Sequence, residues 1–306
     1  LISRTNANQI TLTEIDGALR TVENGTKAWL YFRVPDQPMI ERAAIVLNRN
    51  RDIRPACDEF ELCTGGAALP CDLLAHGMTA MRLLGTKSRF QGYIHAKRTV
   101  DGWHGQIRPA GSNYPPCEFF DVELDRLVTE QFPHTLSGMA DVTIHRADFR
   151  KGRVENLHGS VVGGPGKISS SLLHAAVEHL RLQAGPQSFT PDELVSYNRL
   201  AFAFALNPKD GLVLAGIDWQ HVPDQPVLSD GQTPLLGRTI QASSPNEIVS
   251  PLEIVRAMVP GVAAQVPAAP QADRLARYLP AVDVVPAAKK HAHSRVASAA
   301  DDAPRR

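Results

Sequence analysis

The sequence predicts a mainly β protein with a few helices (α+β), in which antiparallel hairpins follow one another along the chain. Four hairpin patterns with glycine-containing turns lie within about the first 220 residues. Their strands mostly alternate apolar and polar residues, which is typical of an antiparallel sheet with one dry face. Helical periodicity is confined to short segments. We therefore expect serial antiparallel hairpins that form a curved sheet or groove, with helices at about 169-183 and 250-259.

The first two hairpins are predicted from the pairs Asn24-Gly25 and Asp101-Gly102, which favour tight turns because the central residues need positive φ. Folding the second hairpin about Asp101-Gly102 places Val100 opposite Trp103. The same register places Ala96 opposite Ile107. The dry side of this hairpin is then expected to carry Ile94, Ala96, Val100, Trp103 and Ile107.

Two further hairpins are predicted to turn at Lys151-Gly152 and through residues 207–211. In the third hairpin Ala147 and Phe149 fall out of phase with the preceding alternation, which indicates a β-bulge. In the fourth, alanines alternate with large apolar residues, so we expect both faces to be covered. The apolar residues that share one face in these two hairpins are Ala140, Val142, Ile144, Leu200, Phe202, Phe204 and Leu206.

Capping residues bound the predicted helices. The first helix opens with serines and ends before Gly185-Pro186, and the second begins at Ser250, which forms a capping-box pattern with Glu253. A short third helix is expected after Gln271. We divide the chain into an N-terminal β-hairpin region (1-135), a second β-hairpin region with two helices (136-280) and a disordered tail (281-306), which is rich in alanine, charge and proline.

Composition excludes several classes of protein. Lysine plus arginine is 32 and aspartate plus glutamate is 32, so the chain lacks the basic excess expected of a nucleic-acid-binding protein. No apolar run is long enough to span a bilayer, and the first residues do not form a signal peptide. Because the sequence begins at Leu1, we interpret it as a segment of a longer chain.

The four cysteines, Cys57, Cys63, Cys71 and Cys117, match no CxxC zinc or redox pattern. Two interpretations stay open. One or two disulfides would need an oxidising compartment, and the turn at Thr64-Gly65-Gly66 would let Cys63 approach Cys71. Alternatively, all four are buried thiols that act as small hydrophobic residues.

No motif of an established catalytic class is present, so we expect no catalytic residue, no cofactor and no metal site. His95 and His104 are expected on the wet face of the second hairpin, two rungs apart, but no third ligand is placed beside them. The glycine-rich turn at 163–166, followed by Lys167 and a serine-opened helix, could hold an anion. A simple strand-to-helix reversal is the favoured interpretation of that turn.

One stretch carries a family resemblance. Residues 137–180 read SGMADVTIHRADFRKGRVENLHGSVVGGPGKISSSLLHAAVEHL. The succession of G-x-A-x-V-x-I, A-x-F-R-x-G-R-V and L-x-G-x-V, then a glycine-rich turn into an apolar helix, resembles the C-terminal repeats of AsmA-like and TamB-like bacterial cell-envelope proteins. The stretch EFFDVELDRLVTEQFP is similar to the linkers between such repeats, and ITLTEIDGALRTVENGTKAWLYFRVPDQP is similar to one of their hairpins. Arg98, Gly105, the Ser250 helix and Ala67–Cys71 depart from the pattern.

The resemblance implies a periplasmic protein that is anchored to the inner membrane through a part of the chain not present here. It also implies a long, curved β-groove whose apolar interior shields acyl chains, as in bridge-like lipid-transfer proteins. We therefore expect a non-enzymatic envelope scaffold that binds phospholipid or another envelope lipid. The candidate groove residues are Ile94, Ala96, Trp103, Ile107, Val142, Ile144, Leu200, Phe202 and Phe204. The alternative for each is ordinary core beneath the helix at 172–180.

Two further functions are kept as alternatives. The first is a protein-interaction module that binds envelope proteins through exposed sheet edges. Edge strands that carry the basic residues Lys97, Arg98, Arg150 and Arg153 are expected to be protected against such pairing. The second is a metal-dependent hydrolase, which depends on His95 and His104 alone.

Overall fold

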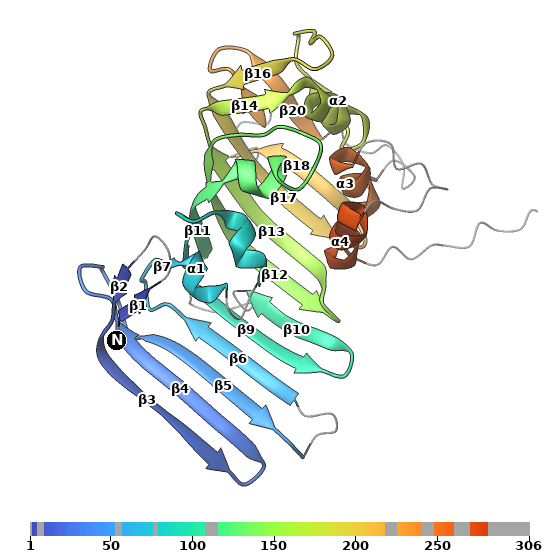
Figure 1. The fold of residues 1–306 in the computed structure, drawn as a ribbon. Helices are drawn as coiled ribbons and strands as arrows, with labels where there is room; N and C mark the ends of the chain where they lie inside the picture. The colour runs from blue at the N-terminus through green and yellow to red at the C-terminus, as the bar shows by residue number, and fades with distance from the viewer. Residues whose placement is uncertain are drawn as a thin grey trace, which may run out of the picture.

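The computed structural model confirms a mainly β chain, in which serial antiparallel hairpins form one long sheet that does not close on itself (Figure 1). The predicted tail at 281-306 lies outside the described residues. The structure describes residues 2–4, 9–52, 57–75, 79–107, 116–217, 225–239, 248–259 and 270–280.

The strands of the main sheet follow chain order over most of its width. In sheet order, the central path runs through β3 (Thr13–Val22), β4 (Gly25–Arg33), β5 (Ala43–Asn50), β6 (Cys57–Cys63), β9 (Tyr93–Thr99), β10 (Gly102–Ile107), β12 (Met139–Arg150), β13 (Arg153–Gly163) and β17 (Arg199–Asn207). The far end is completed by β18 (Gly211–Gly216), β19 (Leu228–Ser229), β20 (Pro234–Thr239) and β15 (Leu182–Ala184). Each strand therefore pairs mainly with its neighbours in the sequence.

A short branch extends the middle of the sheet. It contains β11 (Cys117–Glu123), β8 (Arg89–Gln91) and β7 (Leu69–Pro70). One half of β12 pairs with β10 and the other half pairs with β11. The sheet therefore continues without a break from the strands that precede residue 135 to the strands that follow it. Two separate ribbons are formed by β1 (Ile2–Arg4) with β2 (Gln9–Thr11) and by β14 (Gly166–Ser169) with β16 (Leu194–Tyr197).

The helices are short. They are α1 (Cys71–Leu74), the 3-10 helix η1 (Thr79–Leu84), the π-helix η2 (Asp125–Thr129), α2 (Ser170–Glu178), α3 (Pro251–Met258) and α4 (Pro270–Tyr278). The helices expected near 169, 250 and 271 are therefore present. The first ends at Glu178 rather than near residue 183, because Leu182–Ala184 pairs with β20 as β15. Ser169 and Ser250 cap α2 and α3, accepting hydrogen bonds from the amides of Leu172 and Leu252.

The first two hairpins turn one residue earlier than expected. Val22 pairs with Gly25, and Thr99 pairs with Gly102, so each glycine follows its turn instead of occupying it. Close approach of a neighbouring strand explains the glycine at position 25, where a Cβ atom would lie 1.7 Å from the carbonyl oxygen of Arg49.

This correction shifts the second hairpin's predicted register by two residues. Ala96 faces Gly105 and Trp103 faces Arg98, while Val100 lies in the turn. A shift of two leaves each residue on its predicted face, because side chains alternate with a period of two.

The third and fourth hairpins turn as predicted, at Lys151-Gly152 and through 207–211. Lys151 (φ 55°) and Gly152 (φ 74°) both have the positive φ that a tight primed turn requires. The predicted bulge in β12 is confirmed as a register shift between Ile144 and Arg146. A second shift, between Asp148 and Phe149, restores the register before the turn.

The predicted edge positions are wrong. Lys97 and Arg98 lie in β9, between β6 and β10, and Arg150 and Arg153 face each other at the turn of the interior hairpin β12–β13. The N-terminal edge of the main sheet is instead β3, which pairs only with β4 in the described part of the chain. Sequence alternation identifies strands but does not show which strand is outermost.

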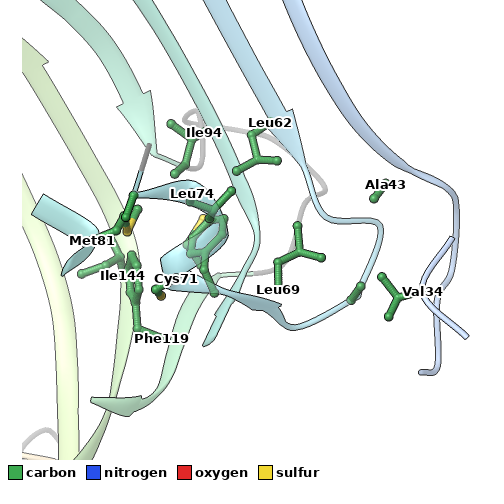
Figure 2. Close-up of a cluster of buried hydrophobic side chains, with 14 of the residues drawn as sticks. Val34, Ala43, Leu62, Leu69, Cys71, Leu74, Met81, Ile94, Phe119 and Ile144 are labelled. Atoms are coloured by element: carbon green, nitrogen blue, oxygen red, sulfur yellow. The ribbon is translucent and has the colours of Figure 1, made fainter. Parts of the chain in front are cut away.

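Three apolar clusters cover parts of one face of the sheet. Figure 2 shows the first cluster, in which Leu69, Cys71 and Leu74 pack onto Leu62 and Ile94 of the sheet. The second surrounds α2, and the third joins α3 and α4 to Leu206 and Leu212. In Figure 1, none of the described helices crosses the end of β3–β10 where the hairpins turn.

All four cysteines are buried free thiols, which agrees with the second interpretation of the sequence. Burial raises the pKa of the Cys63 and Cys71 thiols, so both are held in the protonated form. The thiol of Cys117 donates a hydrogen bond to the carbonyl oxygen of Tyr93 at 3.2 Å. These cysteines therefore act as core residues.

Candidate functional site: an open apolar strip on the sheet

Strand pairing aligns the apolar residues into two parallel rows that run across the strands on one face. The first row, here called the inner row, has one residue from each of ten consecutive strands, and every residue is apolar. In sheet order it contains Gly17, Leu30, Ile45, Leu62, Ile94, Ile107, Ala147, Leu157, Leu206 and Leu212. The inner row is thus an unbroken apolar line across ten strands on one face of the sheet.

A second row, here called the outer row, lies beside the inner row toward the hairpin turns. It crosses eight strands and is also entirely apolar. Its members are Leu19, Ala28, Leu47, Phe60, Ala96, Gly105, Phe149 and Val154. The two rows together form a strip two side chains wide.

The inner row is largely covered, whereas part of the outer row is open. Leu62 and Ile94 of the inner row are 0% and 4% exposed, because the first cluster packs on them. In the outer row Leu19 is 74% exposed and Leu47 is 48% exposed. Apolar side chains are thus accessible to solvent next to a covered apolar core.

A polar row borders the open side of the strip. It runs from Thr21 and Thr26 through Arg49 and Asp58 to Arg98. The guanidinium of Arg49 lies 3.6 Å from the carboxylate of Asp58. This row, here called the rim, brings charged groups directly beside the apolar outer row, as at the edge of an amphipathic binding surface.

Gly105, which interrupts the predicted dry face, does not break the apolar strip. It lies directly opposite Phe149, and a Cβ atom at Gly105 would be 2.6 Å from Cζ of the phenylalanine ring. Gly159 has the same relation to Phe204, with a corresponding distance of 2.5 Å. In both places an aromatic ring covers the surface that the glycine leaves bare.

The nine candidate groove residues all lie on this one face of the sheet. Ile94, Ala96, Ile144 and Leu200 are buried, so they contribute to the covered part of the face. Ile107, Val142, Phe202 and Phe204 are half-buried, and Trp103 is 41% exposed beside the rim. The structure brings the nine together as a surface but leaves only some of them accessible.

Sequence reasoning did not select the most open residues, Leu19 and Leu47, or their neighbour Phe60. The signal was present in β6, where Phe60 and Leu62 alternate with the acidic residues Glu59 and Glu61. In β5 five consecutive apolar residues, 43–47, conceal the alternation. The shared row becomes visible only once the strands are paired in register.

The opposite face of β6 and β9 carries charged residues. Nε2 of His95 lies 2.9 Å from a carboxylate oxygen of Glu59, and this hydrogen bond lowers the pKa of Glu59. Arg20 lies over the ring of Trp29 on this face, 5.0 Å from its centroid. Along β3–β9 the sheet is therefore amphipathic, with the apolar strip on one face and more charged residues on the other.

The histidine pair does not form a metal centre in the described residues. His104 faces Lys97, so it is one same-face rung from His95 rather than two. No group of three or more His, Cys, Asp or Glu side chains in the described ranges could hold a metal ion.

The anion interpretation of the glycine-rich turn is also unsupported. Strand β14, which begins at Gly166, separates the glycine-rich turn from the first turn of α2. The glycines therefore do not lie at the helix N-terminus, where backbone amides would face a ligand.

A polar network holds α2 and α3 together. His134 is 3% exposed, and its Nε2 donates to the carbonyl oxygen of Ala257 at 2.9 Å. Its Nδ1 lies 3.0 Å from the hydroxyl of Ser171, which in turn is 3.0 Å from that of Ser169. Burial lowers the pKa of His134, although the hydrogen bond to Ala257 opposes this effect. The neutral imidazole thus cross-links the two helices.

A hollow of about 550 Å³ lies between α2 and the β15–β20 pair. Leu173, Val177 and Phe189 supply apolar lining, and His174 and Glu178 supply polar groups. None of its lining residues belongs to the inner or outer row. The hollow is therefore separate from the apolar strip.

The fold and site define an open, amphipathic antiparallel sheet with a partly covered apolar face. In comparisons with protein families, curated proteins and solved structures, none matched this chain. The resemblance to AsmA-like and TamB-like proteins accordingly stays a prediction. Among the described helices, none combines the length and apolar character needed to span a membrane.

Proposed function

We propose that this chain is a non-enzymatic segment of a cell-envelope protein of the AsmA-like and TamB-like kind, and that it binds acyl chains of phospholipid or another envelope lipid. The observation that carries the proposal is the outer row, where Leu19 and Leu47 are open to solvent beside a continuous inner row. Contiguous exposed apolar surface of this kind marks a binding site for an apolar partner.

The dimensions of the outer row suit an acyl chain. Neighbouring strands in a sheet lie about 4.8 Å apart, so a row across eight strands is about 34 Å long. One leaflet of a bilayer contributes roughly half of a hydrocarbon core about 30 Å thick. An extended acyl chain therefore fits along the row with room to move between strands.

The rim suits the polar end of a lipid. Arg49, Asp58 and Arg98 lie beside the outer row, so a headgroup could stay hydrated and meet charges while its chain lies on the apolar residues. The location in the periplasm and an inner-membrane anchor elsewhere in the chain belong to the same proposal and rest on the family resemblance.

Two tryptophans on opposite faces provide an internal test. Trp103 lies beside the rim on the apolar face, whereas Trp29 lies on the polar face. Variants that keep only one of them, with phenylalanine at the other tryptophan positions, are incubated with phospholipid carrying brominated acyl chains. We expect quenching of Trp103 fluorescence and little quenching of Trp29. Equal quenching of both, or bound lipid without quenching of Trp103, would contradict the assignment of the apolar face.

Substitutions on the two faces provide a second readout. Leu47→Asp places a charge in the outer row, whereas Val22→Asp places one on the opposite face at a similar exposure, 45% against 48%. Native mass spectrometry after purification without detergent measures bound lipid. We expect Leu47→Asp to lower lipid occupancy at least tenfold and Val22→Asp to leave it unchanged. A lipid-free wild-type protein that also takes up no added phospholipid would refute the proposal.

A further inference from the structure

The free edge strand β3 has a sequence that complements itself in the antiparallel direction. All of its residues are exposed except Ala18, which is half-buried. In the described part of the chain no strand pairs with its outer edge, so the backbone N–H and C=O groups along that edge can pair with another strand. We propose that two copies of the chain associate by antiparallel pairing of their β3 edges, with Ala18 of one copy opposite Ala18 of the other.

Charge selects this register. Two strands related by a two-fold axis pair residues that point to the same face, so each residue meets one separated from it by an even number of positions. With Ala18 at the axis, Asp16 lies opposite Arg20 of the second copy, and Arg20 lies opposite the second copy's Asp16. Opposite charges placed directly across an antiparallel pair stabilise it.

The side-chain sizes agree with the same register. Gly17 of one copy lies opposite Leu19 of the other, so a bulky side chain meets a position without one. Centring the pair on Leu19 would instead bring two leucines together and place Arg20 opposite Ala18, without a carboxylate across from it. Centring it on Ala18 therefore satisfies both charge and bulk.

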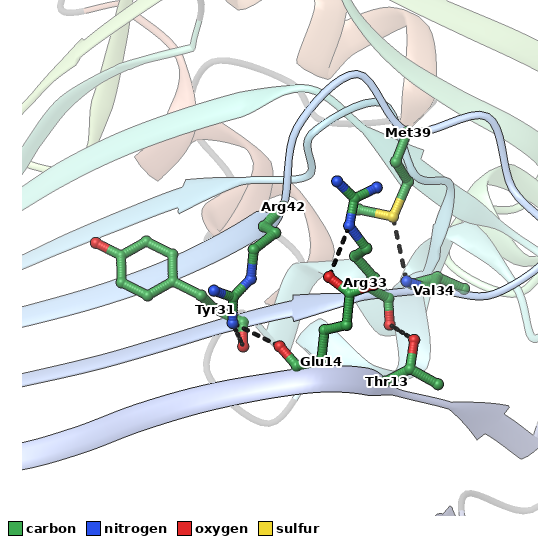
Figure 3. Close-up of polar contacts among 7 residues, drawn as sticks. All are labelled: Thr13, Glu14, Tyr31, Arg33, Val34, Met39 and Arg42. Carbon is green, nitrogen blue, oxygen red and sulfur yellow. Dashed lines mark hydrogen bonds and ion pairs between the residues drawn. The ribbon is translucent and has the colours of Figure 1, made fainter.

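A register centred on Gly17 would pair Arg20 with Glu14, but Glu14 is already engaged. Its carboxylate accepts a hydrogen bond from the guanidinium of Arg33 at 3.0 Å, and its carbonyl oxygen accepts one from Arg42 (Figure 3). Glu14 also has a positive φ of 47°, at a register shift between Thr13 and Asp16. This bulge distorts the start of the strand, so the regular edge that can pair begins at Asp16.

The pairing has a geometric consequence for the apolar face. The two-fold axis of an antiparallel strand pair is perpendicular to the sheet, so both copies present their apolar faces on the same side. The inner row of one copy, which ends at Gly17, then meets the outer row of the other, which ends at Leu19. The two apolar strips become one strip of twice the length. The pairing itself does not require lipid and can be tested without it.

Charge reversal tests the register. Sedimentation velocity over a range of concentrations measures association of the wild type, Asp16→Arg, Arg20→Asp and the double variant. We expect the wild type to dimerise, each single variant to weaken dimerisation at least tenfold, and the double variant to restore it, because the pairs are then reversed. Monomeric wild type at every concentration, or a double variant no stronger than the singles, would overturn the proposal. Circular dichroism checks that each variant is folded.

Thiol cross-linking tests the position of the axis. Ala18→Cys is treated with a short bifunctional thiol reagent, and Val162→Cys, at a 51% exposed position of the interior strand β13, is the control. The four native cysteines are buried and are not expected to react in the folded protein. We expect covalent dimers of Ala18→Cys only. Equal cross-linking of both variants, or none at residue 18, would show that the axis does not lie there.

Discussion

Replacing Leu62 and Leu47 by alanine, one at a time, compares a covered position of the apolar face with an open one. The two residues lie in neighbouring strands, one in the inner row and one in the outer row. Leu62 is 0% exposed and Leu47 is 48% exposed. The same chemical change is therefore made in two environments that differ mainly in their access to water.

The expected costs differ because only one substitution leaves a cavity. Leucine-to-alanine changes at fully buried positions lower the free energy of unfolding by about 2–5 kcal/mol. Burying a whole leucine side chain is worth about 1.5–3 kcal/mol, so Leu47, which is about half-buried, is expected to contribute roughly 1 kcal/mol. Leu62→Ala should thus be at least twice as destabilising as Leu47→Ala.

Urea unfolding followed by circular dichroism measures both free energies without added lipid. Equal losses of 2 kcal/mol or more for the two variants would mean that Leu47 is covered in solution. The open strip, and with it the argument for an acyl-chain site, would then be refuted. A small loss at both positions would show instead that Leu62 is not in a packed core.

Two further predictions concern stability. The pKa of His134 is lowered in the folded protein, so the unfolded chain takes up a proton at this residue more readily than the folded protein does. The contribution of His134 to the free energy of unfolding is therefore complete above the ordinary histidine pKa of about 6.5 and is lost as the pH falls below it. The wild type should therefore lose stability as the pH falls from about 7.5 to about 5.5, a range centred on that value. The variant His134→Asn should be less stable than the wild type at neutral pH, but its stability should depend less on pH. Thermal unfolding at several pH values measures this, and parallel curves for the two proteins would contradict the reasoning. Gly105→Ala should cost about 1–3 kcal/mol, because its Cβ would lie 2.3 Å from the carbonyl oxygen of His95. Gly152→Ala, where no atom lies within 4 Å, should cost about 1–2 kcal/mol from its positive φ alone, and a larger loss there than at Gly105 would contradict the packing argument.

The faces of the strands could be predicted from the sequence, but their order in the sheet could not. Alternation assigns Ile94 and Ile107 to one face whatever the exact register, since an error of two residues preserves the assignment. Whether Lys97 belongs to an edge depends on which distant segments pair with its strand. That pairing is a long-range property that no local pattern contains.

Turn positions illustrate a different limit. The Asn24-Gly25 pair predicts the centre of the turn to within one residue. Glycine is required at position 25 for a different reason, because the backbone of β5 at Arg49 lies too close for a Cβ atom. A glycine required by tertiary packing looks the same in the sequence as one required by a turn. The openness of Leu47 is also a tertiary property, because it depends on where the covering helices end.

The nearly sequential strand order has a consequence for how the molecule comes apart. Because most strands contact only the strands before and after them in the chain, stability is expected to be distributed along the sheet as a series of nearest-neighbour terms. Loss of β3 and β4 would leave β5 as the new edge strand. The inner row would then end at Ile45 and the outer row at Leu47. Hydrogen exchange should consequently be fastest in β3 and slow progressively toward β12 and β13. A sheet built in this way can be lengthened or shortened by whole hairpins without changing the surface that it presents.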